Sequence, residues 1–116
     1  MHRILSEFLN NAKMSGETPF FPPDIAVHIV NKCEQAQIPI YGIDAAKIAD
    51  TCIQPYMQHS VDYTTSPYPE GYFENVWDEA IQFIKRREQL GLHFEIVIPT
   101  EYRADTVLST QNKSNL

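Results

Sequence analysis

One histidine and one aspartate have the spacing that acid–base chemistry could use. His59 and Asp62 stand three positions apart, so a helix would place them on one face and the carboxylate could orient the imidazole. A small hydrolase built on this pair is therefore one hypothesis. We favour the simpler interpretation of two solvated side chains on a polar loop, because no nucleophile with its own base stands near the pair.

The two cysteines, Cys33 and Cys52, each have a histidine within seven positions, His28 and His59 respectively. No local signature of a cysteine nucleophile accompanies either pair. Both cysteines stand among apolar residues, which is typical of small buried thiols. We expect them to stay reduced in a chain without a secretory signal, although spacing alone leaves a disulfide open.

Metal, nucleotide and cofactor sites have no matching motif in this sequence. The candidate metal ligands His28, Cys33, Cys52, His59 and Asp62 lack the short paired spacing of zinc sites such as C-x2-C or H-E-x-x-H. Neither GxGxxG nor GxxxxGK(S/T) is present, so no phosphate-binding loop is indicated. The sequence therefore predicts no cofactor, no metal and no catalytic residue, which favours a binding protein over an enzyme.

The clearest chemical signal is a segment that is rich in acids and tyrosines. Between Lys47 and Lys85 there is no other Lys or Arg, and the acids there carry as much negative charge as the chain's formal net charge of −6. The acids of this interval are Asp50, Asp62, Glu70, Glu74, Asp78 and Glu79. The same interval holds Tyr56, Tyr63, Tyr68, Tyr72 and the single tryptophan, Trp77. Acids and tyrosines together are typical of a surface that binds a basic partner.

The expected partner-binding surface is a long loop and the first turns of the helix that follows it. Its predicted members are Asp62, Tyr63, Tyr68, Glu70, Tyr72, Glu74 and Asp78. The acids would attract the partner over a distance, and the tyrosines, which stand where burial is hard to arrange, would make the desolvated contacts. For Glu74 and Asp78 the alternative is purely local, because a helix N-terminus favours anions. For Trp77 core packing is the expectation.

The charge distribution argues against a nucleic-acid ligand. The basic cluster Lys85–Arg87 falls in the last turns of a predicted helix, where positive charge complements the helix dipole. No apolar run approaches the ~20 residues that span a bilayer, and the N-terminal segment lacks the uninterrupted apolar region of a secretory signal. We therefore expect a cytoplasmic protein that binds neither nucleic acid nor membrane.

The elements that must position these residues can be read from hydrophobic periodicity. At 116 residues we expect one domain, residues 1–105, followed by a polar tail, 106–116, that is expected to be disordered. Helices are predicted over 2–13, 22–37 and 73–90, and strands over 38–43 and 92–98, with extended structure also favoured at 46–48. This order predicts an α+β fold of two layers, with about three helices on a short sheet of two to four strands.

Two connecting segments complete this prediction. Residues 14–22 are expected to be an irregular connector in which Phe20 and Phe21 plug the edge of the core; the alternative is an exposed pair that docks the chain as a non-catalytic adaptor in a stable complex. Residues 51–72 are expected to be a long loop, with a short helix or strand possible within 53–60. If the two main strands are neighbours, the helix at 73–90 could connect them as a crossover, which would pair them in parallel.

Four segments in this order resemble small bacterial immunity proteins of polymorphic-toxin and contact-dependent growth-inhibition systems. They are IPIYGIDAAKI, IQPYMQHSVDYTTSPY, WDEAIQFIKRREQLG and FEIVIP, within residues 38–98. The resemblance implies a cytoplasmic protein that binds one cognate toxin domain and neutralises it. Many such toxins are nucleases with basic clefts, which an acidic surface would suit. The resemblance transfers no contact residues, so the predicted binding surface is based on the charge pattern alone.

Overall fold

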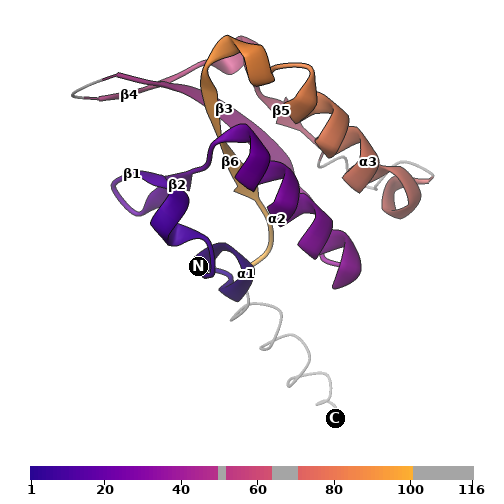
Figure 1. The fold of residues 1–116 in the computed structure, drawn as a ribbon. Helices are drawn as coiled ribbons and strands as arrows, with labels where there is room; N and C mark the ends of the chain where they lie inside the picture. Colours follow the sequence, from indigo (N-terminus) through magenta and orange to yellow (C-terminus); the bar gives the residue numbers. More distant parts are fainter. Residues whose placement is uncertain (50–51, 64–70, 101–116) are drawn as a thin grey trace.

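A computed structural model describes residues 1–49, 52–63 and 71–100 of the chain (Figure 1). The helices are α1 (Arg3–Ser6), α2 (Pro23–Gln35) and α3 (Tyr72–Lys85), and short 3₁₀ turns lie at Leu9–Asn11 (η1), Met57–His59 (η2) and Glu88–Leu90 (η3). The strands are β1 (Lys13–Ser15), β2 (Thr18–Phe20), β3 (Gly42–Ile48), β4 (Ile53–Pro55), β5 (Val61–Asp62) and β6 (Leu92–Val97). The predicted α+β class is confirmed.

Strand β3 is the centre of the main sheet. Along one edge it pairs antiparallel with β6, from Gly42 opposite Val97 to Lys47 opposite Leu92. Along the other edge it pairs antiparallel with β5 at its beginning and with β4 at its end. On the far side of β6, Phe21 forms an antiparallel bridge with Phe94, and so joins the β1–β2 hairpin to the sheet.

Helix α3 is a crossover, but between different strands from those that we expected. Both β5 and β6 run antiparallel to β3, so they are parallel to each other, and α3 connects them with β3 lying between. The two main strands, β3 and β6, are neighbours as considered, but they pair antiparallel, so the conditional crossover between them does not occur. The chain reverses direction between β3 and β4 and enters α3 only afterwards, so β6 returns antiparallel to β3.

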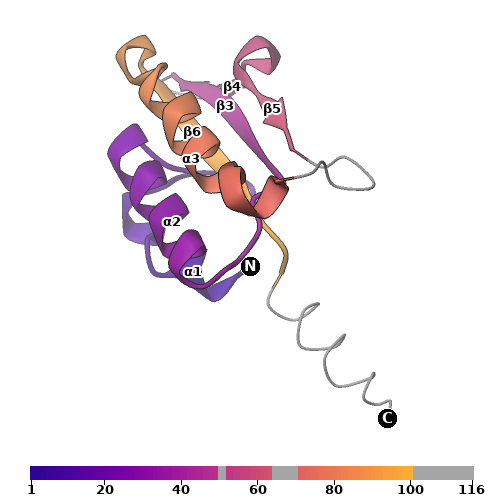
Figure 2. The same cartoon turned by 90° about the vertical axis from the view of Figure 1, so that its right-hand side faces the viewer.

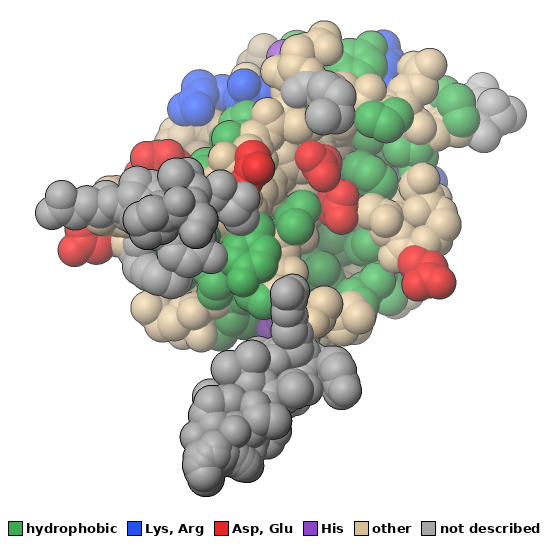
Figure 3. Space-filling model, turned by 180° about the vertical axis from the view of Figure 1, so that it is seen from behind, with side chains coloured by type: hydrophobic (Ala, Val, Ile, Leu, Met, Phe, Trp, Pro, Cys, Tyr) green, Lys and Arg blue, Asp and Glu red, His purple; other side chains and the backbone are tan. Residues whose placement is uncertain are grey.

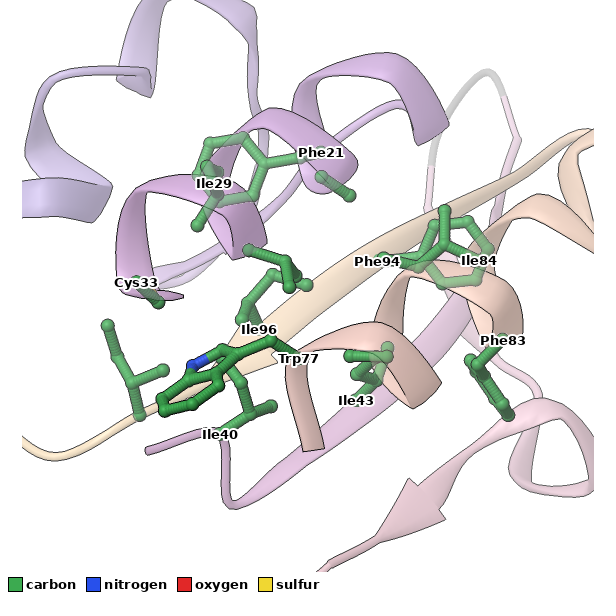
Figure 4. Close-up of a cluster of buried hydrophobic side chains, with 14 of the residues drawn as sticks. Phe21, Ile29, Cys33, Ile40, Ile43, Trp77, Phe83, Ile84, Phe94 and Ile96 are labelled. Atoms are coloured by element: carbon green, nitrogen blue, oxygen red, sulfur yellow. The ribbon is translucent and has the colours of Figure 1, made fainter. Parts of the chain in front are cut away.

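The two long helices pack side by side on one face of the sheet (Figures 1 and 2). Because side chains alternate along a strand, every second residue faces these helices. On β6 the buried residues are Leu92, Phe94 and Ile96, and on β3 they include Ile43 and Ala45. Figure 4 shows side chains from both helices and both strands converging in this core.

Two aromatic predictions about this core hold. Phe21 is completely buried in the core cluster, which confirms the expectation for this residue; Phe20 is also buried, at 8% exposure, but does not belong to that cluster. Their burial also removes the exposed apolar pair that the adaptor hypothesis needs. Trp77 is buried on the apolar face of α3, and its indole Nε1 donates to the carbonyl oxygen of Ile38 at 2.8 Å. Core packing of Trp77 is therefore confirmed.

Helix α2 and strand β6 agree closely with the predicted ranges. Helix α3 begins one residue earlier than predicted and ends at Lys85 rather than near residue 90, where only the turn η3 follows. The N-terminal region differs more. The first helix ends at Ser6, and only the short turn η1 follows it at Leu9–Asn11. Residues 14–22 are not an irregular connector. They contain most of the β1–β2 hairpin, whose turn places Gly16 at φ +61°, a conformation open to glycine.

The middle of the chain is more regular than the sequence indicated. Strand β3 begins at Gly42 rather than at residue 38, and it extends to Ile48, which confirms the extended structure favoured at 46–48. The segment predicted as a long loop contains β4, η2 and β5, each only two or three residues long. These short pieces bring Asp62 and Tyr63 to the edge of the sheet beside α3. The predicted tail, 106–116, lies outside the described residues.

Candidate partner-binding surface

A groove of about 340 Å³ lies between β5 and α3. Its lining residues are Val61, Tyr63, Asp78, Glu79, Gln82, Phe83 and Arg86. The alternation of side chains along β5 turns Val61 and Tyr63 toward the helices and Asp62 toward the other face of the sheet. The groove therefore brings together two predicted surface residues, Tyr63 and Asp78, which are 15 positions apart in sequence.

Helix geometry gives this groove an acidic end and a basic end. Residues four apart share a helix face, so Asp78, Gln82 and Arg86 form one exposed row along α3. Glu74 continues the same row into the first turn, where the positive end of the helix dipole stabilises a carboxylate. The like charges of Glu74 and Asp78 oppose each other by a few tenths of a kcal/mol. Negative charge is thus concentrated at one end of the groove.

Tyr63 forms part of the groove wall on the β5 side. Its half-buried side chain packs against the core, and burial together with the nearby charge of Glu79 raises its pKa to about 12, against an opposing effect of Arg86 and Arg87. The hydroxyl is therefore neutral at physiological pH and can donate a hydrogen bond. Its backbone N–H is already bonded to the carbonyl oxygen of Tyr41 at 2.8 Å, which fixes the residue at the sheet edge.

Tyr72 is not a surface residue, contrary to our expectation. It is only 7% exposed, and its hydroxyl donates a hydrogen bond to the carbonyl oxygen of Ile40. Burial is possible because α3 begins at Tyr72 itself, so the side chain leaves the helix toward the sheet rather than from a loop. Tyr72 therefore attaches the start of α3 to the segment before β3. The other two loop candidates, Tyr68 and Glu70, lie outside the described residues.

Asp62 is exposed, but it does not join Asp78. It pairs with Gly42 across the strands and lines a second hollow on the face of the sheet that the helices leave open. The structure thus divides the predicted surface between two sides of β5: Tyr63 and Asp78 lie on the helix side, and Asp62 lies on the opposite side. Glu74 is exposed on α3 but does not line the groove.

The predicted pair of His59 and Asp62 is also divided in this way. His59 faces α3, where its Nδ1 atom accepts a hydrogen bond from Nε of Arg87 at 3.3 Å. Its ring stacks on Tyr56 with 6.3 Å between centroids, while the Arg87 guanidinium lies 3.8 Å from the centroid of the Phe83 ring. His59 therefore belongs to a cluster that ties η2 to the end of α3, and Asp62 does not orient it.

The two cysteines lie in different settings. Cys33 is fully buried, and burial alone raises the pKa of its thiol to about 12, so it stays protonated. Cys52 is exposed next to β4, which contradicts the expectation that both cysteines are buried. Both are free thiols. Within residues 1–49, 52–63 and 71–100, no three His, Cys, Asp or Glu side chains form a group that could hold a metal ion.

Four polar residues that were not predicted as site residues have notable positions in the structure. Glu79 and Arg86 line the groove, and both belonged to charge runs for which capping was a sufficient explanation. Asp44 and Glu95 are directly opposite each other on β3 and β6. Burial, the charge of Asp44 and a hydrogen bond between the two side chains raise the pKa of Glu95 to about 7. Nothing in the sequence reveals this pair, because the strand register creates it.

His93 is the remaining unusual group on the open face of the sheet. Burial and the nearby positive charge of Lys13 lower its pKa. Its Nδ1 atom is buried and has no hydrogen-bond partner among the described residues. The imidazole is therefore held in its neutral form at physiological pH.

The comparisons with known proteins add no functional assignment. No protein-family model matches the sequence, and no curated protein sequence matches it. Among the described residues, no helix combines the length and the apolar character needed to cross a bilayer. The groove and the charges around it are therefore the features of the chain that bear on function.

Proposed function

We propose that this chain is an immunity protein that binds a cognate toxin domain and neutralises it, acting by binding alone and in the cytoplasm. The observation that carries the proposal is the groove between β5 and α3, in which Asp78 and Glu79 lie beside the half-buried Tyr63. An open groove with exposed carboxylates and a neutral tyrosine hydroxyl suits a basic protein surface. The resemblance of residues 38–98 to immunity proteins supplies the class of partner.

The electrostatics of the groove favour rapid capture of such a partner. Excess negative charge speeds the encounter of oppositely charged proteins by about 10- to 10³-fold, and added salt weakens the effect. Glu74, Asp78 and Glu79 are exposed on α3 and provide this field. Toxins of this kind are commonly nucleases, whose clefts are basic because they bind phosphates. A protein that occupies such a cleft excludes the nucleic-acid substrate.

The short-range contacts would come from the groove wall. Tyrosine contributes strongly to interface energy because it combines a large apolar ring with a hydroxyl, and Tyr63 presents both to the groove. Arg86, at the basic end, would pair with an acidic residue of the partner. The opposite charges at the two ends of the groove thus favour one orientation of the bound partner.

Affinity capture from the producing strain tests this proposal. The tagged protein should recover, at low salt, a single stoichiometric partner with a basic C-terminal domain, identified by mass spectrometry. That domain should show a toxic enzymatic activity that one equivalent of this protein abolishes. Recovery of a multi-subunit metabolic assembly, or a captured partner whose activity is unaffected, would contradict the proposal.

A matched pair of variants assigns the binding to the groove. The double variant Asp78→Asn/Glu79→Gln removes two negative charges inside the groove. The control Glu34→Gln/Glu88→Gln removes the same charge from exposed positions elsewhere. We expect the groove variant to lose capture at moderate salt and the control to retain it. Equal loss in both variants would mean that net charge, rather than the groove, drives binding.

A further inference from the structure

The face of the sheet opposite the helices carries a hollow of about 500 Å³. Its lining residues are Tyr41, Gly42, Asp44, Ser60, Val61, Asp62 and Val97. Figure 3 looks onto this face, where acidic side chains gather near the middle with hydrophobic side chains beside them. Among the described residues that line the hollow, none is Lys or Arg. The hollow is thus negatively charged and partly apolar.

The hollow exists because residue 42 is a glycine. Gly42 lies between Asp62 on β5 and Val97 on β6, and all three positions point to the open face. A Cβ atom at Gly42 would lie only 2.8 Å from the backbone oxygen of Val61, so the close approach of β5 excludes any side chain there. The missing side chain leaves a space whose rim is formed by the neighbouring strands. The packing of β3 against β5 therefore builds the hollow into the fold.

The chemistry of the rim matches a long cationic side chain. Asp62 and Asp44 provide carboxylates from two adjacent strands, while Val97 provides an apolar wall. Arginine and lysine bury their aliphatic stems on such walls and place the charge at the far end. Arginine fits best, because its planar guanidinium can donate to two carboxylates at once.

A carboxyl pair lies beside the hollow on the same face of the sheet. Glu95 lies directly opposite Asp44, and its pKa is raised to about 7 by burial and by Asp44. Next to the hollow, Glu95 thus holds a proton below about pH 7 that an exposed glutamate would release. A guanidinium beside Asp44 would supply the positive charge that this proton now provides.

We propose that this hollow receives an arginine side chain of the protein partner, so that the partner contacts both sides of strand β5. Val61 lines the hollow on one side of β5 and the groove on the other, so the two sites are adjacent. The inference rests on the proposed function in that it takes the partner to be a basic protein. The groove provides the orienting contacts and the hollow provides an anchor for one arginine.

An NMR titration tests the hollow without the partner. The probe is the peptide acetyl-Gly-Arg-Gly-amide, added to ¹⁵N-labelled full-length protein up to about 100 mM. The matched control peptide carries citrulline, which has nearly the same shape and no charge. We expect the arginine peptide to shift the amide signals of Gly42, Asp44, Asp62 and Val97 in a saturable way, and the citrulline peptide to leave them unchanged.

Variants with unchanged shape then locate the interaction. Asp44→Asn and Asp62→Asn should each weaken the peptide at least threefold, and the double variant at least tenfold. The distant control Glu34→Gln should bind as the wild type does. No shifts at these amides, equal shifts with citrulline, or unchanged binding in the double variant would overturn the inference.

The same experiment separates this inference from the proposed function. The groove variant Asp78→Asn/Glu79→Gln should still bind the peptide at the hollow, because Asp78 and Glu79 do not line it. Loss of partner capture in that variant, with peptide binding intact, supports both sites. If partner capture depends on the groove but the peptide does not bind at the hollow, the arginine site is refuted and the proposed function is not.

Discussion

The two faces of strand β6 have opposite characters, although their residues alternate along one short sequence. Leu92, Phe94 and Ile96 point to the helices and are almost completely buried. Between them, His93 and Glu95 point to the open face and have shifted pKa values. On the covered face, each side chain stabilises the fold because it is buried in the core. The open face instead holds two ionisable groups whose partial burial shifts their pKa values.

The covered face should give the largest effect on stability. Phe94 is fully buried and its backbone is bonded to Phe21 in both directions, at 2.8 Å each. Phe94→Ala should lower the free energy of unfolding by about 3–5 kcal/mol, because it removes buried apolar surface and leaves a cavity. Urea denaturation measures this loss. The neighbouring open-face change Val97→Ala should cost far less, and equal costs would contradict the contrast between the faces.

The next effect in size should come from the join between α3 and the sheet. Tyr72→Phe keeps the buried ring and removes only the hydroxyl that donates to the carbonyl oxygen of Ile40. Because that carbonyl then lacks this donor in a buried place, we expect a loss of about 1–2 kcal/mol in the free energy of unfolding. Partner capture should be unchanged. If capture were lost while stability stayed the same, Tyr72 would be a contact residue after all.

On the open face, a substitution at Glu95 should raise the free energy of unfolding rather than lower it. The pKa of Glu95 is about 7 in the folded chain against an ordinary value of 4.5, so the folded state binds a proton that the unfolded chain releases between these values. The stabilisation from this proton is fully present below about pH 4.5 and is lost as the pH rises through 7. After allowance for partial exposure, Glu95→Gln should raise the free energy of unfolding at pH 8 by about 1 kcal/mol.

The pH profile distinguishes this explanation from a general surface effect. Stability of the wild type should fall between pH 5 and pH 8 relative to Glu95→Gln, and the two curves should converge at acidic pH. Thermal unfolding at several pH values gives both curves. A constant difference at every pH would show that Glu95 does not carry the proton.

The smallest effect on stability should come from the groove acids. Asp78 and Glu79 are exposed on α3, and surface substitutions of this kind usually change stability by no more than about 0.5 kcal/mol. Asp78→Asn/Glu79→Gln should therefore unfold at nearly the wild-type urea concentration while losing partner binding. A large loss of stability would mean that Asp78 and Glu79 stabilise helix α3.

Long apolar periodicity made part of this fold predictable from sequence. Helices α2 and α3 and strand β6 each repeat their pattern over enough residues to be recognised. Strands β1, β4 and β5 have two or three residues, and such segments carry no readable period. They form because the register with β2 and β3 pairs their backbones, which only the folded chain reveals.

For the candidate site, the sequence predicted which residue types take part but not how the fold arranges them. The acidic, tyrosine-rich interval led directly to Tyr63 and Asp78, which the structure places in one groove. Tyr72 was expected on the surface because the helix was predicted to begin at residue 73, whereas α3 begins at Tyr72 itself. The pairing of Asp44 with Glu95 joins residues 51 positions apart, and it depends on a register that charge patterns do not specify.

In the proposed complex, the acids of the groove attract a basic partner. The association rate constant with the captured partner, measured by stopped flow from low to high salt, reports this attraction. We expect Asp78→Asn/Glu79→Gln to slow association at low salt at least tenfold and to flatten its salt dependence, whereas Glu34→Gln/Glu88→Gln should leave both nearly unchanged. Identical rates and salt slopes for the wild type and the groove variant would contradict this expectation.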